Sequence, residues 1–160
     1  MQKVTILCTG KLKEKFYLDA VAEYVKRLSR FCKLEIIELP EERLPEDPSP
    51  AQIEAALSKE ADAVRAKLPN GCLVIAMCVE GRERSSEELA RYLADSAAQG
   101  ASHIVFLIGS SFGMHESLKR QAALRLSMSP MTFPHHLARV MVLEQIYRAF
   151  QITAGTRYHK

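Results

Sequence analysis

The chain has 160 residues, of which 48% are hydrophobic and 26% charged, and this is the size and composition of one ordinary soluble domain. Its longest uninterrupted apolar run, CLVIAMCV at residues 72–79, is far shorter than the ~20 residues that span a membrane, and the first apolar run is too short for the core of a secretion signal. The four cysteines form no Cys-x-x-Cys pair and are expected to be reduced, so the sequence predicts a cytoplasmic protein with no membrane partner.

The net charge of +3 is too small to indicate a nucleic-acid-binding protein, but the charges are distributed unevenly. Residues 1–33 contain eight Lys and Arg against three acids, residues 34–69 four against nine, and residues 115–160 seven against two. Basic ends of this kind favour contact with phosphate groups about as much as they favour an ordinary solvated surface.

The first half of the chain alternates between short apolar runs and helical patterns. KVTILCT at residues 3–9 predicts a strand, and apolar residues recur at helical spacing over 17–31. KLEIIEL at 33–39 predicts a second strand. The four prolines and clustered acids of residues 40–50 predict a loop, and a helix is expected over 51–68.

The second half continues the alternation. Its expected elements are a buried strand at 72–79, a helix at 85–100, a strand at 103–108, a helix at 116–126 and a last helix at 135–152. Ser85 and Glu88 have the spacing of a capping box at the start of the helix expected over 85–100. Strands that alternate with helices of this length predict a single-domain α/β fold over residues 1–160, with a mostly parallel sheet and helices on both faces.

Ligands of parallel sheets gather at the carboxyl ends of the strands, so the segments that follow the strands are the candidate sites. After the strand at 103–108 comes GSSFG, in which Gly109 would let the backbone approach a ligand, although a structural turn explains the glycines at least as well. The segment SMSPMTFP at 127–134 mixes large apolar residues with small hydroxyls and two prolines. It suits either an apolar slot for a flat heterocycle or a buried connection.

The last helix is apolar around most of its circumference, apart from a polar stripe that includes Glu144 and Arg148. Such a helix is expected to pack against its own sheet and against a second subunit, which predicts a homodimer. Its first residues, His135 and His136, point about 100° apart and have no third ligand at suitable spacing, so no metal site is expected.

The chain ends in AGTRYHK, which places two titratable and two cationic side chains within four residues. Terminal residues usually fray and have no need of such a concentration of functional groups. The sequence therefore predicts that this tail belongs to a site.

The segments FLIGSSFG, LSMSPMTFPHHLARVMVLEQIYRAFQI and the terminal YHK resemble the RlmH family of SPOUT methyltransferases, most specifically over residues 104–160. The resemblance implies an α/β sheet whose C-terminal part, about 104–160, is threaded into a trefoil knot, and a homodimer. It also implies S-adenosyl-L-methionine as the cofactor. The implied activity is methylation of N3 of a pseudouridine in 23S rRNA, in the ribosome or its large subunit.

Carried onto this chain, the family's cofactor contacts fall in three segments. The implied cofactor-binding residues are Met77, Gly109, Met128, Ser129, Pro130, Met131, Thr132 and Phe133. Ser110 stands where the family usually has a second glycine, and Lys160 stands where it more often has arginine, whose bidentate fork a lysine lacks.

Methylation at N3 requires loss of the proton on that nitrogen. Tyr158 and His159 are candidates to accept or orient this proton, and Arg148 is a candidate to hold a phosphate or a negative charge on a base oxygen. These three are the candidate catalytic residues, and no single base is assigned. A noncatalytic nucleotide-sensing or ribosome-associated module is the main alternative, and a metal-dependent hydrolase using the histidines is a weaker one.

Overall fold

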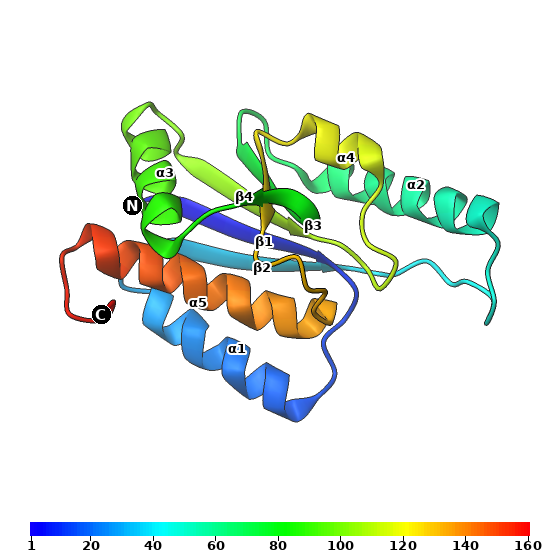
Figure 1. Ribbon diagram of the computed structural model, residues 1–160, viewed down its shortest axis with the longest axis horizontal. Helices are drawn as coiled ribbons and strands as arrows, with labels where there is room; N and C mark the ends of the chain where they lie inside the picture. The colour runs from blue at the N-terminus through cyan, green and yellow to red at the C-terminus, as the bar shows by residue number, and fades with distance from the viewer.

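The computed structural model describes residues 1–160 and has three layers, with a five-stranded sheet between two layers of helices (Figure 1). The strands are β1 (Lys3–Thr9), β2 (Lys33–Leu39), β3 (Leu73–Glu83), β4 (His103–Ile108) and β5 (Leu124–Ser127). The helices are α1 (Lys15–Leu28), α2 (Pro50–Lys67), α3 (Ser86–Ala98), α4 (Glu116–Gln121) and α5 (His135–Thr153).

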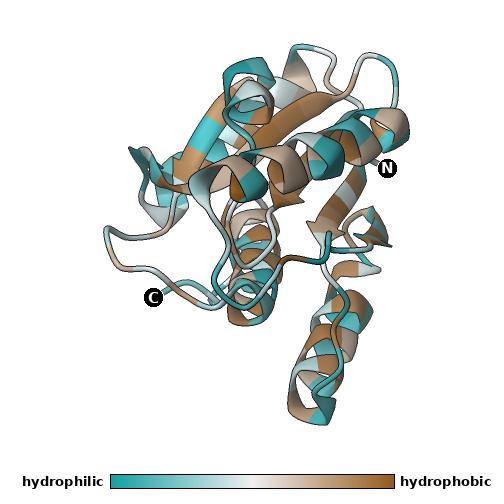
Figure 2. Ribbon diagram, turned by 90° about the vertical axis from the view of Figure 1, so that its right-hand side faces the viewer, coloured by the Kyte–Doolittle hydropathy of each residue, from teal (hydrophilic) through white to brown (hydrophobic).

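All neighbouring strands pair in parallel, in the order β2-β1-β4-β3-β5, which confirms the predicted sheet. The strands of the centre are buried on both faces, so they read as continuous apolar runs. In β4, Phe106 joins the core under α1, α3 and α5, whereas Val105 and Leu107 join the core under α2 and α4. Figure 2 shows the apolar strands inside and helices that carry both apolar and polar stripes.

The helix expected over residues 116–126 is confirmed only over its first half. Helix α4 ends at Gln121, and Ala122 adopts an extended ψ of 143° that leads into the short strand β5. The residues from Ala122 to Leu126 are good helix formers, but pairing with β3 and burial of Leu124 and Leu126 outweigh this weak propensity. Tertiary contacts therefore decide this segment.

Strand β3 extends four residues beyond the predicted run and bulges where it passes β5. Leu126 pairs with Met77 before the bulge and with Arg82 after it. A Cβ on Gly81 would lie 2.8 Å from the backbone of Arg125, so only glycine lets the two chains approach this closely. The bulge thus holds Met77 and the end of β5 side by side.

The local signals for helix starts are confirmed. Ser85 and Glu88 form the predicted capping box of α3, in which each side chain bonds the other residue's backbone N–H. The cysteines are free, and no helix has the length and apolar character needed to cross a membrane. Since all five strands run in the same direction, their carboxyl ends and the loops that follow them meet at one edge of the sheet.

Candidate functional site

The largest cavity at this edge, the glycine-turn cavity, has a volume of about 790 Å³. The bulged part of β3, the segments after β4 and β5 and the start of α5 form its walls. Of the implied cofactor-binding residues, Met77, Gly109, Met128, Ser129, Met131, Thr132 and Phe133 line it. Pro130 is exposed and does not line it, although it lies within the same segment. The structure thus places seven of these eight residues around one cavity.

The turn formed by residues 109–113 is held by two backbone hydrogen bonds. The N–H of Ser110 donates to the carbonyl of Gly113 (3.0 Å), and the N–H of Gly113 donates back to the carbonyl of Ser110 (2.8 Å). Gly113 has a φ of +90°, which favours glycine. A Cβ on Gly109 would lie 2.4 Å from the Gly113 carbonyl oxygen. The close approach within the turn therefore requires glycine at position 109.

The rim of the glycine-turn cavity is apolar and open to solvent. Val79, Phe112 and Met131 are among the few large apolar side chains exposed on the molecule, and Met131 is 72% exposed. The segment that carries Met131 is ordered by Ser129, whose hydroxyl accepts the Met131 backbone N–H at 3.0 Å. An exposed apolar rim around a concave site is typical of a surface that a ligand covers.

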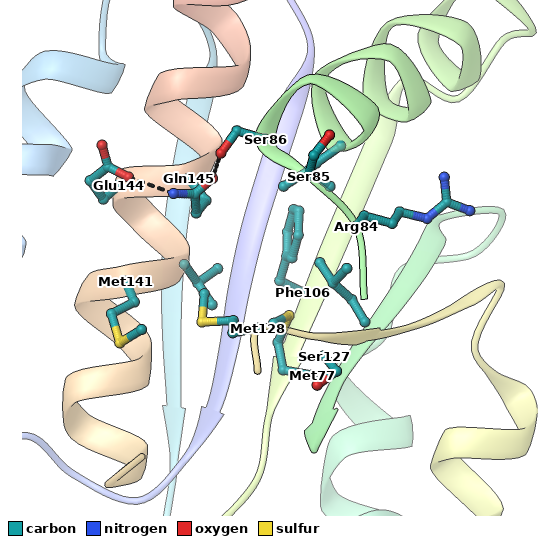
Figure 3. A pocket seen from close by; sticks show the side chains of 13 residues that line it. Met77, Arg84, Ser85, Ser86, Phe106, Ser127, Met128, Met141, Glu144 and Gln145 are labelled. Carbon is teal, nitrogen blue, oxygen red and sulfur yellow. Dashed lines mark hydrogen bonds between the residues drawn. The ribbon is translucent and has the colours of Figure 1, made fainter. Parts of the chain in front are cut away.

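A second cavity of about 400 Å³, the α3–α5 cavity, lies between the start of α3 and the middle of α5. It shares Met77, Leu126 and Met128 with the glycine-turn cavity, so the two are neighbours. Figure 3 shows residues of α3 and of α5 on opposite sides of this space. Their polar ends form a chain in which Ser86 donates to Gln145 (2.7 Å) and Gln145 donates to Glu144 (2.9 Å).

The C-terminal tail folds back along α5 and reaches Glu144 from the other side. The Tyr158 hydroxyl donates to Glu144 Oε1 at 3.2 Å, and its ring packs edge-on against Tyr147. Arg148 donates to Glu144 at 2.6 Å and lies over the Tyr158 ring, 4.9 Å from its centroid. The structure thus brings Arg148, Tyr158 and His159 together with Glu144 and Glu87, and these five residues are called here the tail cluster.

His159 lies between Arg148 and Glu87. Its Nδ1 is 3.2 Å from Arg148 Nη1, and its Nε2 is 2.7 Å from Glu87 Oε1. Because a guanidinium group can only donate, Nδ1 is the acceptor, and the ring proton of the neutral imidazole lies on Nε2 and points to Glu87. The hydrogen bond from His159 lowers the pKa of Glu87.

Burial raises the pKa of Tyr158, and the nearby Glu144 carboxylate raises it further. The hydrogen bond to Glu144 raises the pKa of Arg148, which stays charged. In the docked tail, Tyr158 is therefore a hydrogen-bond donor and a poor proton acceptor. Of the two roles that the sequence left open for Tyr158, accepting a proton or orienting it, the docked geometry favours orientation.

The two neighbouring histidines do not form a metal centre, because no three His, Cys, Asp or Glu side chains lie close enough to hold a metal ion. Burial lowers the pKa of His135, and the adjacent His136 lowers it further. His135 lines the glycine-turn cavity, whereas His136 contacts Glu14.

Sequence reasoning missed Glu87, Ser86 and Met141, which contribute to the tail cluster or to the α3–α5 cavity. Glu87 and Ser86 read as part of a helix start, where a serine and an acidic residue are common. Their distance in sequence from α5 hid the contact. Local spacing patterns cannot predict a contact between residues 87 and 159, which are 72 positions apart.

The family model described as "Predicted SPOUT methyltransferase" matches residues 2–159. Proteins named "Ribosomal RNA large subunit methyltransferase H" are similar over nearly the whole chain. The one from Streptococcus uberis is 46% identical over 158 residues, covering 99% of both chains, and the one from Ligilactobacillus salivarius is 45% identical over 157 residues, covering 98% of this chain and 99% of its own. A solved structure, "a probable methylase family protein from Haemophilus influenzae Rd KW20", has the same fold, with a TM-score of 0.51, 14% identity, and coverage of 99% of this chain and 70% of that one.

Proposed function

Since the chain belongs to the SPOUT methyltransferase family, we propose that it methylates ribosomal RNA of the large subunit, with S-adenosyl-L-methionine as the methyl donor and N3 of a pseudouridine in 23S rRNA as the acceptor. One observation carries the proposal: a cavity fit for a nucleoside adjoins a second cavity that is lined by Glu144 of the tail cluster, and the two share Met77 and Met128. Donor and acceptor sites of a transfer reaction must be neighbours in this way.

The glycine-turn cavity fits the proposed donor in size and chemistry. Its volume of about 790 Å³ is within the usual range for small-molecule sites, and its walls combine apolar side chains with irregular backbone. Gly109 and the segment Met128–Phe133 would hold the adenosine, with Met77 at the junction of the two cavities. When bound, the sulfonium group of this cofactor supplies an electrophilic methyl group.

The tail cluster offers groups for the acceptor base. Arg148 is a fixed cation that stabilises negative charge on a carbonyl oxygen of the base as the N3 proton departs. Tyr158 donates a hydrogen bond and orients the base or the Glu144 carboxylate. His159 accepts the proton only after its Nδ1 has left Arg148, because both ring nitrogens are occupied in the docked tail.

The proposal includes a homodimer and a trefoil knot over about residues 104–160. Three large apolar side chains on α1 are exposed, namely Phe16, Leu18 and Val25, and several apolar residues of α5 are only half-buried. These surfaces support contact with a second subunit that would cover them. The passage of the chain from α4 on one face through β5 to α5 on the other face is compatible with threading. Sedimentation at micromolar concentration tests the dimer, and a species of only 18.0 kDa would contradict it.

The acceptor is proposed to be a folded ribosomal surface, because a domain of 160 residues has little area for reading an RNA sequence. The test is transfer of a tritiated methyl group from labelled S-adenosyl-L-methionine to ribosomes, large subunits and protein-free 23S rRNA that lack the modification. We expect incorporation into ribosomes or subunits. Calorimetric titration with the cofactor and with S-adenosylhomocysteine is the companion measurement, and absence of both binding and transfer would overturn the proposal.

A further inference from the structure

A buried carboxylate outside both cavities lies behind the glycine turn. Glu60 on α2 is 7% exposed and has no cationic partner. Its Oε1 accepts the hydroxyl of Ser110 at 2.8 Å, and its Oε2 accepts the backbone N–H of Glu42 at 2.9 Å. Burial raises the pKa of Glu60, which the two hydrogen bonds oppose. A carboxylate held in this way is costly unless its hydrogen bonds are made.

Ser110 connects this carboxylate to the wall of the glycine-turn cavity. It is 6% exposed, its backbone makes both hydrogen bonds that close the turn with Gly113, and it lines the cavity together with Gly109. A shift of the Ser110 side chain therefore moves the turn backbone. The contact with Glu60 fixes the turn from behind, on the side away from the ligand space.

The loop after β2 holds the other side of the same turn. Glu41 Oε1 accepts the backbone N–H of Ser111 at 3.1 Å and also its hydroxyl. Since Glu42 donates to Glu60, this loop, helix α2 and the turn form one connected set of hydrogen bonds. Only a carboxylate presents two acceptor oxygens to two donors from different segments, because an amide would replace one acceptor by a donor.

We propose that Glu60 is a positioning residue of the methyl-donor site, which acts through Ser110 to set the geometry of the 109–113 turn for the cofactor. The proposal rests on the function proposed above. It assigns to this carboxylate an effect on cofactor affinity, and not only on the stability of the fold. A packing role alone would leave the affinity unchanged.

The test compares Glu60→Gln, Ser110→Ala, the double variant and a matched control, Asp62→Asn, which removes an exposed carboxylate two residues away on the same helix. Calorimetry with S-adenosyl-L-methionine should show about a tenfold weaker Kd for each single variant, as expected for loss of a hydrogen bond to a charged group. The double variant should be no weaker than Glu60→Gln alone, because both changes break one contact. In methyl transfer, KM for the cofactor should rise while kcat stays within about twofold.

A second readout needs no cofactor. In the free protein, the amides of Ser110 and Gly113 should exchange hydrogen faster in Glu60→Gln than in wild type or Asp62→Asn. Ser110→Ala removes a single hydroxyl and keeps the test open if Glu60→Gln fails to fold. Unchanged affinity and exchange in Ser110→Ala, with wild type binding normally, would overturn the inference and leave the proposed function standing. A wild-type protein that binds no cofactor would overturn the proposed function and this inference with it.

Discussion

The glycine turn lines one cavity and the C-terminal tail bonds Glu144 of the neighbouring cavity, yet the two segments are held by different kinds of contact. The turn of residues 109–113 is closed by backbone hydrogen bonds and backed by the buried pair of Ser110 and Glu60. The tail is held by side chains, and the outermost pair, His159 with Glu87, has a Glu87 side chain that is 55% exposed. An exposed hydrogen bond of this kind contributes little, because water competes for both partners. We therefore expect the tail to open more readily than the turn.

The largest expected effect separates the two regions. Deleting residues 158–160 should lower the rate of methyl transfer to ribosomes on the order of 10²–10⁴-fold. The reason is that the acceptor base loses the hydrogen bond from the Tyr158 hydroxyl and the His159 imidazole that accepts its proton. The Kd for S-adenosyl-L-methionine should stay within about twofold. Lys160→Ala, which changes only the exposed last residue, is the control. If the truncated chain methylates as fast as the full chain, the tail cluster has no part in the reaction.

The reciprocal change acts on the turn. Gly109→Val would place side-chain atoms against the Gly113 carbonyl, where even a Cβ lies at 2.4 Å, so the turn must open. We expect cofactor affinity to fall about a hundredfold and the free energy of unfolding to fall by about 1–3 kcal/mol, as for overpacked sites.

Gly71→Ala is the control for that variant. Unlike Gly109, Gly71 has a positive φ, of +72°, but nothing lies within 4 Å of its added Cβ, and it does not line either cavity. It should lose about 1 kcal/mol of stability and keep its cofactor affinity. Normal cofactor binding by a folded Gly109→Val protein would remove the turn from the site.

The ion pair that joins α5 to β2 should matter for stability. Arg139 on α5 donates to Glu38 at 2.6 Å and to the carbonyl of Gly10 at 3.2 Å, and its side chain is 3% exposed. Glu38→Gln leaves the guanidinium group buried without a counter-charge and should cost about 3 kcal/mol in denaturant unfolding. Glu35 lies on the same strand as Glu38 and makes an exposed pair with Lys3 of β1, so Glu35→Gln should cost less than about 1 kcal/mol. Equal losses would show that burial of the Arg139 pair is not what stabilises this end of α5.

The smallest effect is that of the Tyr158 hydroxyl. Tyr158→Phe keeps the ring against Tyr147 and removes only the hydrogen bond to Glu144, so we expect about a tenfold lower rate at saturating ribosome. Full recovery at high ribosome concentration would instead assign the hydroxyl to binding.

The raised pKa of Tyr158 predicts the sign of a pH effect on the tail. A group whose pKa is raised in the folded state stabilises that state below its ordinary pKa, about 10 for tyrosine, and loses this contribution as the pH rises through the raised value. Docking of the tail should therefore weaken in alkaline solution in wild type and not in Tyr158→Phe. Hydrogen exchange of residues 156–160 across this pH range checks the difference, and identical profiles would contradict it.

The sequence predicted the parallel sheet, the helices on both faces and the segments that form the glycine-turn cavity, since these depend on local periodicity and on the geometry of strand ends. It failed at β5, where LRLS becomes a strand because β3 offers a partner. It also missed Glu60 and Glu87, which meet their partners 50 and 72 residues away. Contacts over such distances are determined by the packing of whole elements and leave no local pattern.

The central claim is most directly tested by the chemical identity of the product. Ribosomes that lack the modification would be incubated with the protein and isotopically labelled S-adenosyl-L-methionine, and nucleosides from the digested 23S rRNA would then be separated and identified by mass spectrometry. The account predicts labelled methyl groups on a single pseudouridine, at N3. Label on another nucleotide, or no label at all with a protein that binds the cofactor, would contradict it.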